Sequence, residues 1–482
     1  MGKSNKNFVN LKRLLILAGV FYALFLIIFL TARPFVRPSQ QWTAKPDVPP
    51  ASQAPAIGKR VKIEDRKLWV DFDQNGRYEP FVVKGVGYSS IPIGHFLSHE
   101  WGMCEYKGGG EHLVFEERFK ILPDEVQAFH CEAKIISIYQ DERVLERDLP
   151  LIQAMNANTI RTWGKVTSQL LKKSDKYGLK VIAGYWVAHQ LDFIKELESA
   201  RIGQSALVED FVSYVMEFKD EPAVLMWGLS NENNIGFCTF SGANCSQQDK
   251  QDQATAFYKL INFMAGQAKK AEGDGFHPVI VVTSELAFLE FNAEHLPDVD
   301  IHGINSYRGR NFDIFGEGNI FKKFSRRFSD RPMIITEFGT DAWFTIDPSD
   351  PASGEERQDL QAEYVASAWD DIVDEMNQGA AVLGGVVFNY SDQWNLATIN
   401  NLPDGMWTPS VAIHDTVYWG YPINPPPWNG HMPDGFVNIE WYGLMAVEEN
   451  PDGARCGQPA GVDCIYPRQV YHALKEKFSQ VH

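Results

Sequence analysis

The sequence lacks the common signatures of nucleotide and metal chemistry. No apolar strand is followed by the Gly-x-Gly-x-x-Gly pattern that binds dinucleotides. It has no Cys-x-x-Cys pair, no cluster of cysteine and histidine, and no His-x-His at a strand end, which argues against a zinc site or a metal-dependent hydrolase. No repeat with the period of a solenoid stands out. We therefore expect an activity that needs no cofactor and no metal.

Basic residues are scarce relative to acidic ones. The chain has 45 lysines and arginines against 62 acidic residues, which gives a formal net charge of −17. Outside the first 37 residues no basic patch is visible, so we expect no nucleic-acid partner. Aromatic residues are plentiful at 13%, with 13 tryptophans. Such rings stack on sugar faces but also fill large cores, so they are only a weak indication of a carbohydrate ligand.

The six cysteines form three close pairs along the chain. The simplest pairing joins Cys104 with Cys131, Cys238 with Cys245, and Cys456 with Cys464. An even number of cysteines in an exported protein indicates disulfides. The alternative is six reduced cysteines in a cytosolic protein.

Residues 14–32 are predicted to form a transmembrane helix that anchors the protein. The run from Leu14 to Thr31 holds 18 residues without a charge, which is just enough to span a bilayer. Four basic residues precede it, so residues 1–13 would form a cytoplasmic tail and the remainder would be periplasmic or extracellular. A cleavable signal peptide is the alternative, but Leu30 fits poorly in a small-residue cleavage site ending at Ala32.

Residues 33–58 are predicted to be a proline-rich linker, and residues 59–482 a catalytic domain. Six prolines and few hydrophobic residues lie between positions 33 and 57, which is typical of a semi-rigid spacer. About 420 residues are long for one domain, but a barrel of eight strands and helices with insertions reaches this size. Nothing in the sequence indicates an obligate protein partner.

The fold expected for the catalytic domain is a (β/α)8 barrel preceded by a short β-hairpin. The hairpin covers residues 61–83, with its turn at Asp73 to Gly76. Eight short runs rich in Val, Ile or aromatics follow: Val83–Ser89, Thr159–Trp163, Lys180–Trp186, Ala223–Leu229, Pro278–Thr283, Asp300–Tyr307, Met333–Phe338 and Val382–Tyr390. Helical patterns lie between several of them, at Ser168–Tyr177, Val208–Phe218, Asp252–Lys270 and Asp359–Asn377, and another ends the chain at Arg468–Phe478. Strands alternating with helices predict a parallel barrel.

Two long segments interrupt this alternation, at about residues 91–150 and 395–465. Long loops after barrel strands commonly shape the substrate site.

Two glutamates stand at strand ends. Glu232 follows the apolar run that begins at Ala223, and Glu337 closes the run that begins at Met333. Burying a lone carboxylate is costly, so each needs a reason. One reason is an ion pair with an arginine or lysine of the barrel. The other is catalysis, since two carboxyl groups facing each other across a cleft supply a general acid/base and a nucleophile.

The surrounding residues resemble the retaining glycoside hydrolases of clan A, which share the (β/α)8 barrel. Asn231-Glu232 is similar to the acid/base motif at the end of the clan's fourth strand, and Thr336-Glu337-Phe338-Gly339 to the nucleophile motif at the end of its seventh. The segment Gly384 to Phe388 is similar to family 2 members. Residues 84–88 and 158–161 are partly similar to β-1,3-glucanosyltransferases. The resemblance covers residues 60–480.

The resemblance assigns four more positions. Arg161 is similar to the strand-two arginine that supports the nucleophile, and Tyr307 to the strand-six aromatic residue whose hydroxyl bonds it. Asn231 would bond the 2-hydroxyl of the sugar, and Trp394 would lie beneath that sugar.

Three residues near strand ends are further candidates for sugar contacts: Trp186, His189 and Trp343. Each tryptophan is equally compatible with a core position, and a lone histidine is more often structural.

These assignments predict a retaining β-glycosidase that acts on β-linked oligo- or polysaccharides. Glu232 would be a protonated acid whose pKa is raised by the charge of Glu337 and by burial near Trp227. Glu337 would attack the anomeric carbon. Two alternatives are a β-glucan transglycosylase on the same site and a carbohydrate-binding surface protein without activity.

Overall fold

The computed structural model describes most of the chain beyond residue 59. The described segments are residues 60–93, 141–238, 245–314, 318–347, 350–393 and 432–481, apart from a few single positions, and the backbone of six short strands between residues 95 and 137. In these segments no helix has the length and apolarity needed to cross a membrane. The predicted cytoplasmic tail, anchor and linker lie outside the described residues.

Eight parallel strands close into a barrel, which confirms the predicted fold. In order around the barrel they are β4 (Val83–Gly87), β11 (Thr159–Arg161), β12 (Lys180–Tyr185), β13 (Val224–Leu229), β14 (Val279–Ser284), β15 (Ile301–Asn305), β18 (Met333–Phe338) and β21 (Val382–Val387). Seven strands lie within the predicted apolar runs, and β14 extends one residue beyond its run, to Ser284. Almost every residue of these strands is buried, as expected where a parallel sheet is covered on both faces.

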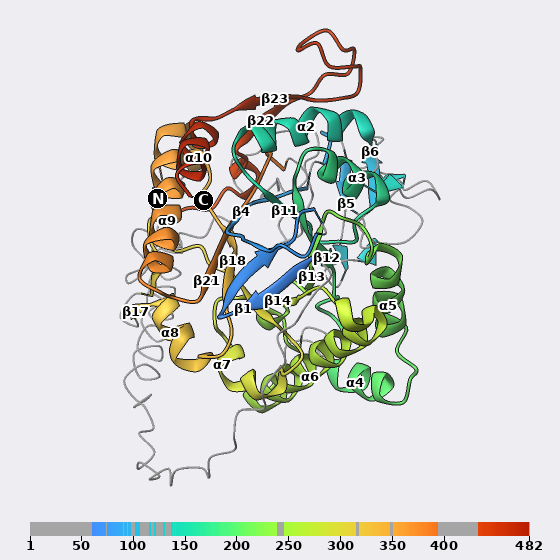
Figure 1. Ribbon diagram of the computed structural model, residues 1–482. Coiled ribbons are helices and arrows are strands. Elements are labelled where there is room, and N and C mark those ends of the chain that lie inside the picture. The colour runs from blue at the N-terminus through green and yellow to red at the C-terminus, as the bar shows by residue number, and fades with distance from the viewer. Residues whose placement is uncertain are drawn as a thin grey trace, which may run out of the picture. The chain divides into compact units, whose positions relative to one another are not determined.

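Helices surround the barrel in the order of the strands (Figure 1). They are α2 (Glu142–Ala154), α3 (Ser168–Lys176), α4 (Phe193–Arg201), α5 (Ala206–Phe218), α6 (Gln247–Glu272), α7 (Leu289–Asn292), α8 (Ile320–Arg327), α9 (Gln358–Asn377) and α10 (Gln469–Ser479). The five predicted helices correspond to α3, α5, α6, α9 and α10. The prediction that residues 91–150 form one irregular insertion is wrong at its end. There α2 buries Leu145, Leu149 and Ile152 against the barrel although charged residues interrupt its pattern.

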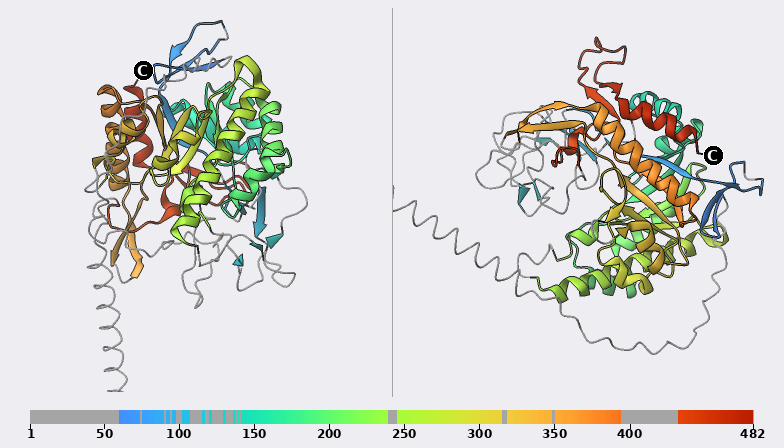
Figure 2. Two further views of the ribbon diagram at one scale, coloured as in Figure 1. Left: turned by 90° about the horizontal axis from the view of Figure 1, so that it is seen from below. Right: turned by 90° about the vertical axis from the view of Figure 1, so that its left-hand side faces the viewer.

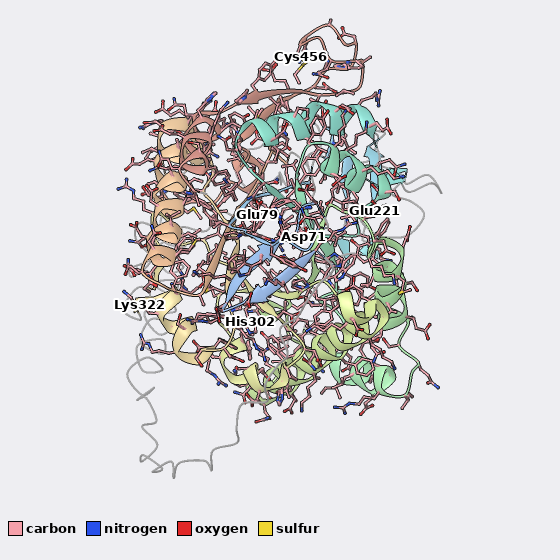
Figure 3. The ribbon with its side chains drawn as sticks, in the orientation of Figure 1. Asp71, Glu79, Glu221, His302, Lys322 and Cys456 are labelled. Carbon is pink, nitrogen blue, oxygen red and sulfur yellow. A yellow bond between two sulfur atoms is a disulfide. The ribbon has the colours of Figure 1, made fainter. Side chains whose placement is uncertain are left out.

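The segment before the barrel is a three-stranded antiparallel sheet rather than a simple hairpin. Strand β1 (Val61–Glu64) pairs with β2 (Lys67–Val70), and β2 pairs with β3 (Glu79–Pro80). The predicted turn at Asp73 to Gly76 joins β2 to β3, and the backbone N–H of Gly76 donates to Asp71 at 2.8 Å. The pair Asp65 and Arg66, both with positive φ, makes the second, unpredicted turn. Figure 3 labels Asp71 and Glu79 on this sheet.

The three-stranded sheet closes the amino-terminal end of the barrel. Val61, Leu68 and Phe81 from the sheet share one apolar cluster with barrel residues such as Leu225 and Ile334. Figure 2 shows this sheet at one end of the barrel and the hairpin of β19 (Trp343–Asp347) and β20 (Asp350–Glu356) at the other. Because the sheet covers the amino-terminal end of the barrel, a substrate site is expected at the carboxyl ends of the strands.

The remaining strands form small sheets outside the barrel. Strand β6 (Gly102–Tyr106) pairs with β5 (His95–Leu97), β9 (Phe129–His130) and β10 (Ile136–Ser137). The other pairs are β7 (Phe115–Glu116) with β8 (Lys120–Ile121), β16 (Asp313–Ile314) with β17 (Gly318–Asn319), and β22 (Met445–Glu448) with β23 (Cys464–Pro467).

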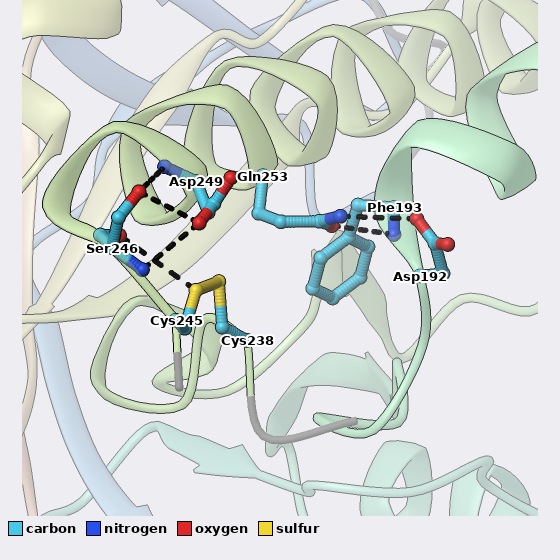
Figure 4. The surroundings of a disulfide bond; sticks show 7 residues. All are labelled: Asp192, Phe193, Cys238, Cys245, Ser246, Asp249 and Gln253. Carbon is cyan, nitrogen blue, oxygen red and sulfur yellow. Dashed lines mark hydrogen bonds between the residues drawn. A yellow bond between two sulfur atoms is a disulfide. The ribbon is translucent and has the colours of Figure 1, made fainter. Parts of the chain in front are cut away.

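Two of the three predicted disulfides are present. Cys238 is bonded to Cys245 just before the capping box that starts α6, where Ser246 and Asp249 exchange hydrogen bonds (Figure 4). Cys456 is bonded to Cys464 at the β22–β23 hairpin, where Figure 3 labels Cys456. The predicted pair of Cys104 and Cys131 lies outside the residues whose side chains are described.

His302 on β15 makes the stability of the fold sensitive to acid. Its ring is fully buried against Phe324 and Phe328, at centroid distances of 5.6 and 4.4 Å. Burial, aided by the charge of Arg331, lowers the pKa of His302 to about 3. Below the ordinary histidine pKa the unfolded chain binds a proton that the native state does not, so stability falls as the pH drops from about 6.5 towards 3.

We expect this one histidine to remove roughly 2–3 kcal/mol of unfolding free energy between pH 7 and 4.5. Urea unfolding of the wild type and of His302→Phe at both pH values measures it. The variant should lose less stability on acidification by that amount. Equal losses in the two proteins would contradict the assignment.

Candidate active site

The two glutamates lie at the carboxyl ends of their barrel strands. Glu337 is the fifth residue of β18 and pairs in register with Asn305 of β15. Glu232 follows β13 and precedes a short 3-10 helix, Asn233–Ile235. Its backbone is left-handed, with φ 54°, as is that of Ser230 with φ 68°. Non-glycine residues seldom adopt this region, and such strain clusters at functional sites.

The carboxylate of Glu337 is held by three hydrogen-bond donors. Its Oε1 accepts from Arg161 Nη1 at 2.7 Å and from Trp163 Nε1 at 2.8 Å. Its Oε2 accepts from the hydroxyl of Tyr307 at 2.7 Å. Only 5% of Glu337 is exposed. The three donors, one of them a charged guanidinium, fix the orientation of the carboxylate.

Glu232 has the opposite electrostatic environment. Burial, followed by the negative charge of Glu337, raises the pKa of Glu232 to about 7. The side-chain amide of Asn305 donates to its Oε1 at 3.1 Å and partly opposes this shift. The two carboxyl groups therefore lie in different environments, one oriented by three hydrogen-bond donors and the other buried beside a negative charge.

Trp227 is not the source of the burial of Glu232, contrary to the prediction. Its side chain packs away from the barrel interior, against the ring of Tyr214 at 5.4 Å, and its indole nitrogen donates to Glu272 of α6 at 3.1 Å. Successive side chains of a strand point to opposite faces. Met226, one residue earlier, belongs to the cluster in the barrel interior.

A chain of hydrogen bonds connects the two glutamates. Asn231 Oδ1 accepts from Arg161 Nη2 at 2.7 Å and from Asn305 Nδ2 at 3.1 Å. Arg161 also reaches Glu337, and Asn305 also reaches Glu232. Because both of these bonds end at the oxygen of Asn231, its NH2 group is the part that can donate to a ligand.

The other residues that the sequence predicted to contact a sugar are not all close to this network. His189 Nε2 is 2.7 Å from the backbone oxygen of Asn231, and its ring stacks on the half-buried Trp186 at 5.2 Å. Trp186 in turn packs against the aromatic cluster that contains Trp163. Trp343 is on the β19–β20 hairpin, with its ring 5.0 Å from that of Trp441. Trp394 lies outside the described residues.

Two residues of the site, Trp163 and Asn305, were not among the predicted ones. Both lie two residues from a candidate that was predicted, Trp163 from Arg161 and Asn305 from Tyr307. Side chains at positions i and i+2 of a strand share one face. Arg161 and Asn305 end β11 and β15, and Trp163 and Tyr307 follow two residues later, so an alternation that continues just past each strand end was the available signal.

Comparison with known proteins places the chain in a family. The model of the glycosyl hydrolases family 2 TIM barrel domain matches residues 130–393. No curated protein matches the sequence.

Several solved structures are similar to the chain. A β-D-glucuronidase from Dictyoglomus thermophilum is 16% identical with a TM-score of 0.45, and the alignment covers 88% of this chain and 54% of that one. A family 2 β-galacturonidase from Eisenbergiella tayi, bound to galacturonate, is 12% identical with a TM-score of 0.47 and the same coverage. A β-glucuronidase from Ruminococcus gnavus, in complex with D-glucuronic acid, is 15% identical with a TM-score of 0.46, over 87% and 51% of the two chains. The chain thus spans about half the length of these proteins.

The family match extends from the segment before α2 to residue 393, just beyond the last barrel strand, and so contains seven of the eight strands and both glutamates. It covers more than half of the 482 residues. By its TIM barrel domain, this chain belongs to the glycosyl hydrolases of family 2.

Proposed function

We propose that the protein is a retaining β-glycoside hydrolase in which Glu232 is the acid/base and Glu337 the nucleophile. One observation carries the proposal: a buried carboxyl group with a pKa of about 7 lies beside a second carboxylate that three hydrogen-bond donors orient. Retaining glycosidases need such a pair, one group to donate a proton and one to attack.

The reaction has two displacements. Glu337 attacks the anomeric carbon while the bond to the leaving oxygen breaks, and Glu232 gives that oxygen its proton. Glu232, now ionised, then takes a proton from water as the water oxygen attacks the same carbon. The bond between the sugar and Glu337 breaks, and its electron pair returns to the carboxylate.

The substrate we propose is a β-linked oligo- or polysaccharide. The NH2 group of Asn231 is free to donate to the 2-hydroxyl of the reacting sugar, a contact that strengthens in the transition state. The stacked rings of Trp186 and His189 offer an apolar face of the kind on which sugars stack. Arg161 and Tyr307 act through Glu337, Trp394 would lie beneath the reacting sugar, and Trp343 is a further candidate for a sugar contact.

The pH dependence of kcat/KM follows from the protonation state of Glu232. The free enzyme is active only while Glu232 is protonated, so activity should fall as the pH rises through about 7. We expect about a tenfold loss for each further pH unit. Initial rates between pH 4 and 9 on a substrate with a poor leaving group, such as a methyl or oligosaccharide glycoside, measure this limb. If kcat/KM did not fall by pH 9, the acid role of Glu232 would be contradicted.

Screening for the sugar tests the proposal directly. Aryl β-glycosides, β-glucans and β-mannans would be offered to the full-length protein, and the first product would be followed by NMR. A β-configured product supports retention, whereas an α-configured first product would remove the nucleophile role from Glu337. Product analysis at high oligosaccharide concentration separates hydrolysis from transglycosylation, and binding without turnover of any of these glycans would favour a carbohydrate-binding protein.

We propose a periplasmic or extracellular location for the catalytic domain, behind the membrane anchor at residues 14–32. The two disulfides are consistent with an oxidising compartment, because cytosolic thiols are kept reduced. Alkaline carbonate extraction of cell membranes would release the protein if the anchor is absent or cleaved.

A further inference from the structure

Trp163 donates the third hydrogen bond to Glu337, and its side chain is closely packed on the sides that face Phe388 and Gly87. The side chain is 6% exposed, and its ring packs edge-on against Phe388 at 5.6 Å. A Cβ atom at Gly87, on the neighbouring strand β4, would lie 2.7 Å from the Trp163 ring, closer than real Cβ atoms approach. The absent side chain at Gly87 therefore makes room for the indole. The ring is fixed by packing, so its N–H is held at the carboxylate before any substrate arrives.

The three donors are divided unequally between the two oxygens of Glu337. Oε1 accepts from Arg161 and Trp163, whereas Oε2 accepts from Tyr307 alone. Each carboxylate oxygen offers about two lone-pair positions. Oε1 is therefore fully used, and Oε2 keeps one position for a bond to carbon.

We propose that Trp163 is a positioning residue that selects Oε2 of Glu337 as the attacking atom and stabilises the carboxylate each time it carries charge. This inference rests on the proposed function. In the first step Oε2 bonds to the anomeric carbon, and Oε1 becomes the carbonyl oxygen of the resulting ester. In the second step that ester bond breaks and the negative charge returns to the carboxylate, where the indole N–H again donates to Oε1.

Removal of the N–H has two consequences. The ionised form of Glu337 loses a charge-assisted hydrogen bond, so the carboxylate binds a proton at a higher pH. The carboxylate also becomes a poorer leaving group, so the second displacement slows more than the first. A residue that only filled space would produce neither effect.

The test compares the wild type with Trp163→Phe, and with β-(3-benzothienyl)alanine at position 163, which replaces the N–H by sulfur and keeps the ring shape. We expect the acidic limb of kcat/KM to move up by about one pH unit. On 2,4-dinitrophenyl β-glycosides, where the second step limits the rate, we expect kcat to fall about tenfold. KM should fall together with kcat, because the glycosyl-enzyme accumulates. Intact-protein mass spectrometry during the steady state should detect this glycosyl-enzyme.

Met432→Leu is the matched control, because Met432 belongs to the same buried aromatic cluster as Trp163 but has no contact with Glu337 among the described residues. It should change neither the acidic limb nor the values of kcat and KM on the dinitrophenyl substrates. Thermal unfolding of all variants would identify any loss of fold, and the benzothienyl protein keeps the test decisive if Trp163→Phe is unstable. An unchanged acidic limb and unchanged kcat in an active, folded benzothienyl protein would overturn the inference and leave the proposed function intact. A wild type without activity on any glycoside would instead remove the proposed function.

Discussion

Glu337→Gln should reduce turnover by at least about 10⁴-fold, because no other group can form the bond to the sugar. Glutamine keeps the shape of glutamate: its amide oxygen can accept from Arg161 and Trp163 in place of Oε1, and its NH2 group can donate to the hydroxyl oxygen of Tyr307, so the variant should fold. The measurement is kcat on the best substrate from the screen, together with circular dichroism and thermal unfolding. Treatment of the wild type with an activated 2-deoxy-2-fluoro glycoside should also leave the label on the peptide that contains Glu337.

Glutamine is preferable here to alanine because of the buried arginine. Arg161 is 2% exposed and forms its ion pair with Glu337 at 2.7 Å. Both substitutions leave the charge of Arg161 without its counter-charge, but alanine also removes the hydrogen-bond acceptor, and breaking a buried pair completely costs about 3–5 kcal/mol. Glu337→Ala is therefore expected to lose stability as well as turnover.

The matched control is Glu285→Gln. Glu285 also follows a barrel strand and also pairs with an arginine, Arg308, but among the described residues its carboxylate bonds only Arg308 and Ser306 and not the donors that hold Glu337. We expect its turnover to stay within a few-fold of wild type. If Glu285→Gln were as inactive as Glu337→Gln, or if Glu337→Gln kept wild-type rates, the assignment of the nucleophile would be wrong.

Glu232→Ala should lower kcat/KM for substrates with poor leaving groups much more than for substrates with good ones. With an alkyl or sugar leaving group, which needs a proton, we expect a loss of about 10²–10⁴-fold in kcat/KM. With 2,4-dinitrophenolate, which leaves without a proton, kcat/KM should stay close to wild type. The second displacement then lacks its base, so kcat should still be low.

Two observations complete this test. Azide, which attacks without giving up a proton, should restore turnover of the dinitrophenyl substrate in Glu232→Ala and yield a β-glycosyl azide. The alkaline limb near pH 7 should also disappear from kcat/KM. Equal losses on good and poor leaving groups, or an α-glycosyl azide, would contradict the acid/base role of Glu232.

The barrel could be predicted because its signals are local. Strands buried on both faces need continuous apolar runs, and the eight runs in the sequence coincide with the eight strands to within one residue, Ser284 of β14. The surrounding helices show apolar residues at helical spacing, as Phe211, Val215 and Phe218 do in α5. Helix α2 was missed because its two central charged residues, Arg147 and Asp148, are buried as an ion pair, which interrupts the apolar face.

Some features of the protein could be predicted from the sequence alone, and others could not. By itself the sequence determined the barrel, the strand-end positions of Glu232 and Glu337, and the two cysteine pairs that lie close along the chain, because each depends on residues near one another in sequence. Only the tertiary structure decided the rest. Trp163, Asn305 and the hydrogen bonds between the glutamates come from strands far apart in the chain, which meet only when the barrel closes. The pKa of about 7 at Glu232 likewise arises from burial and from the field of a carboxylate 105 positions away, and both exist only in the folded protein.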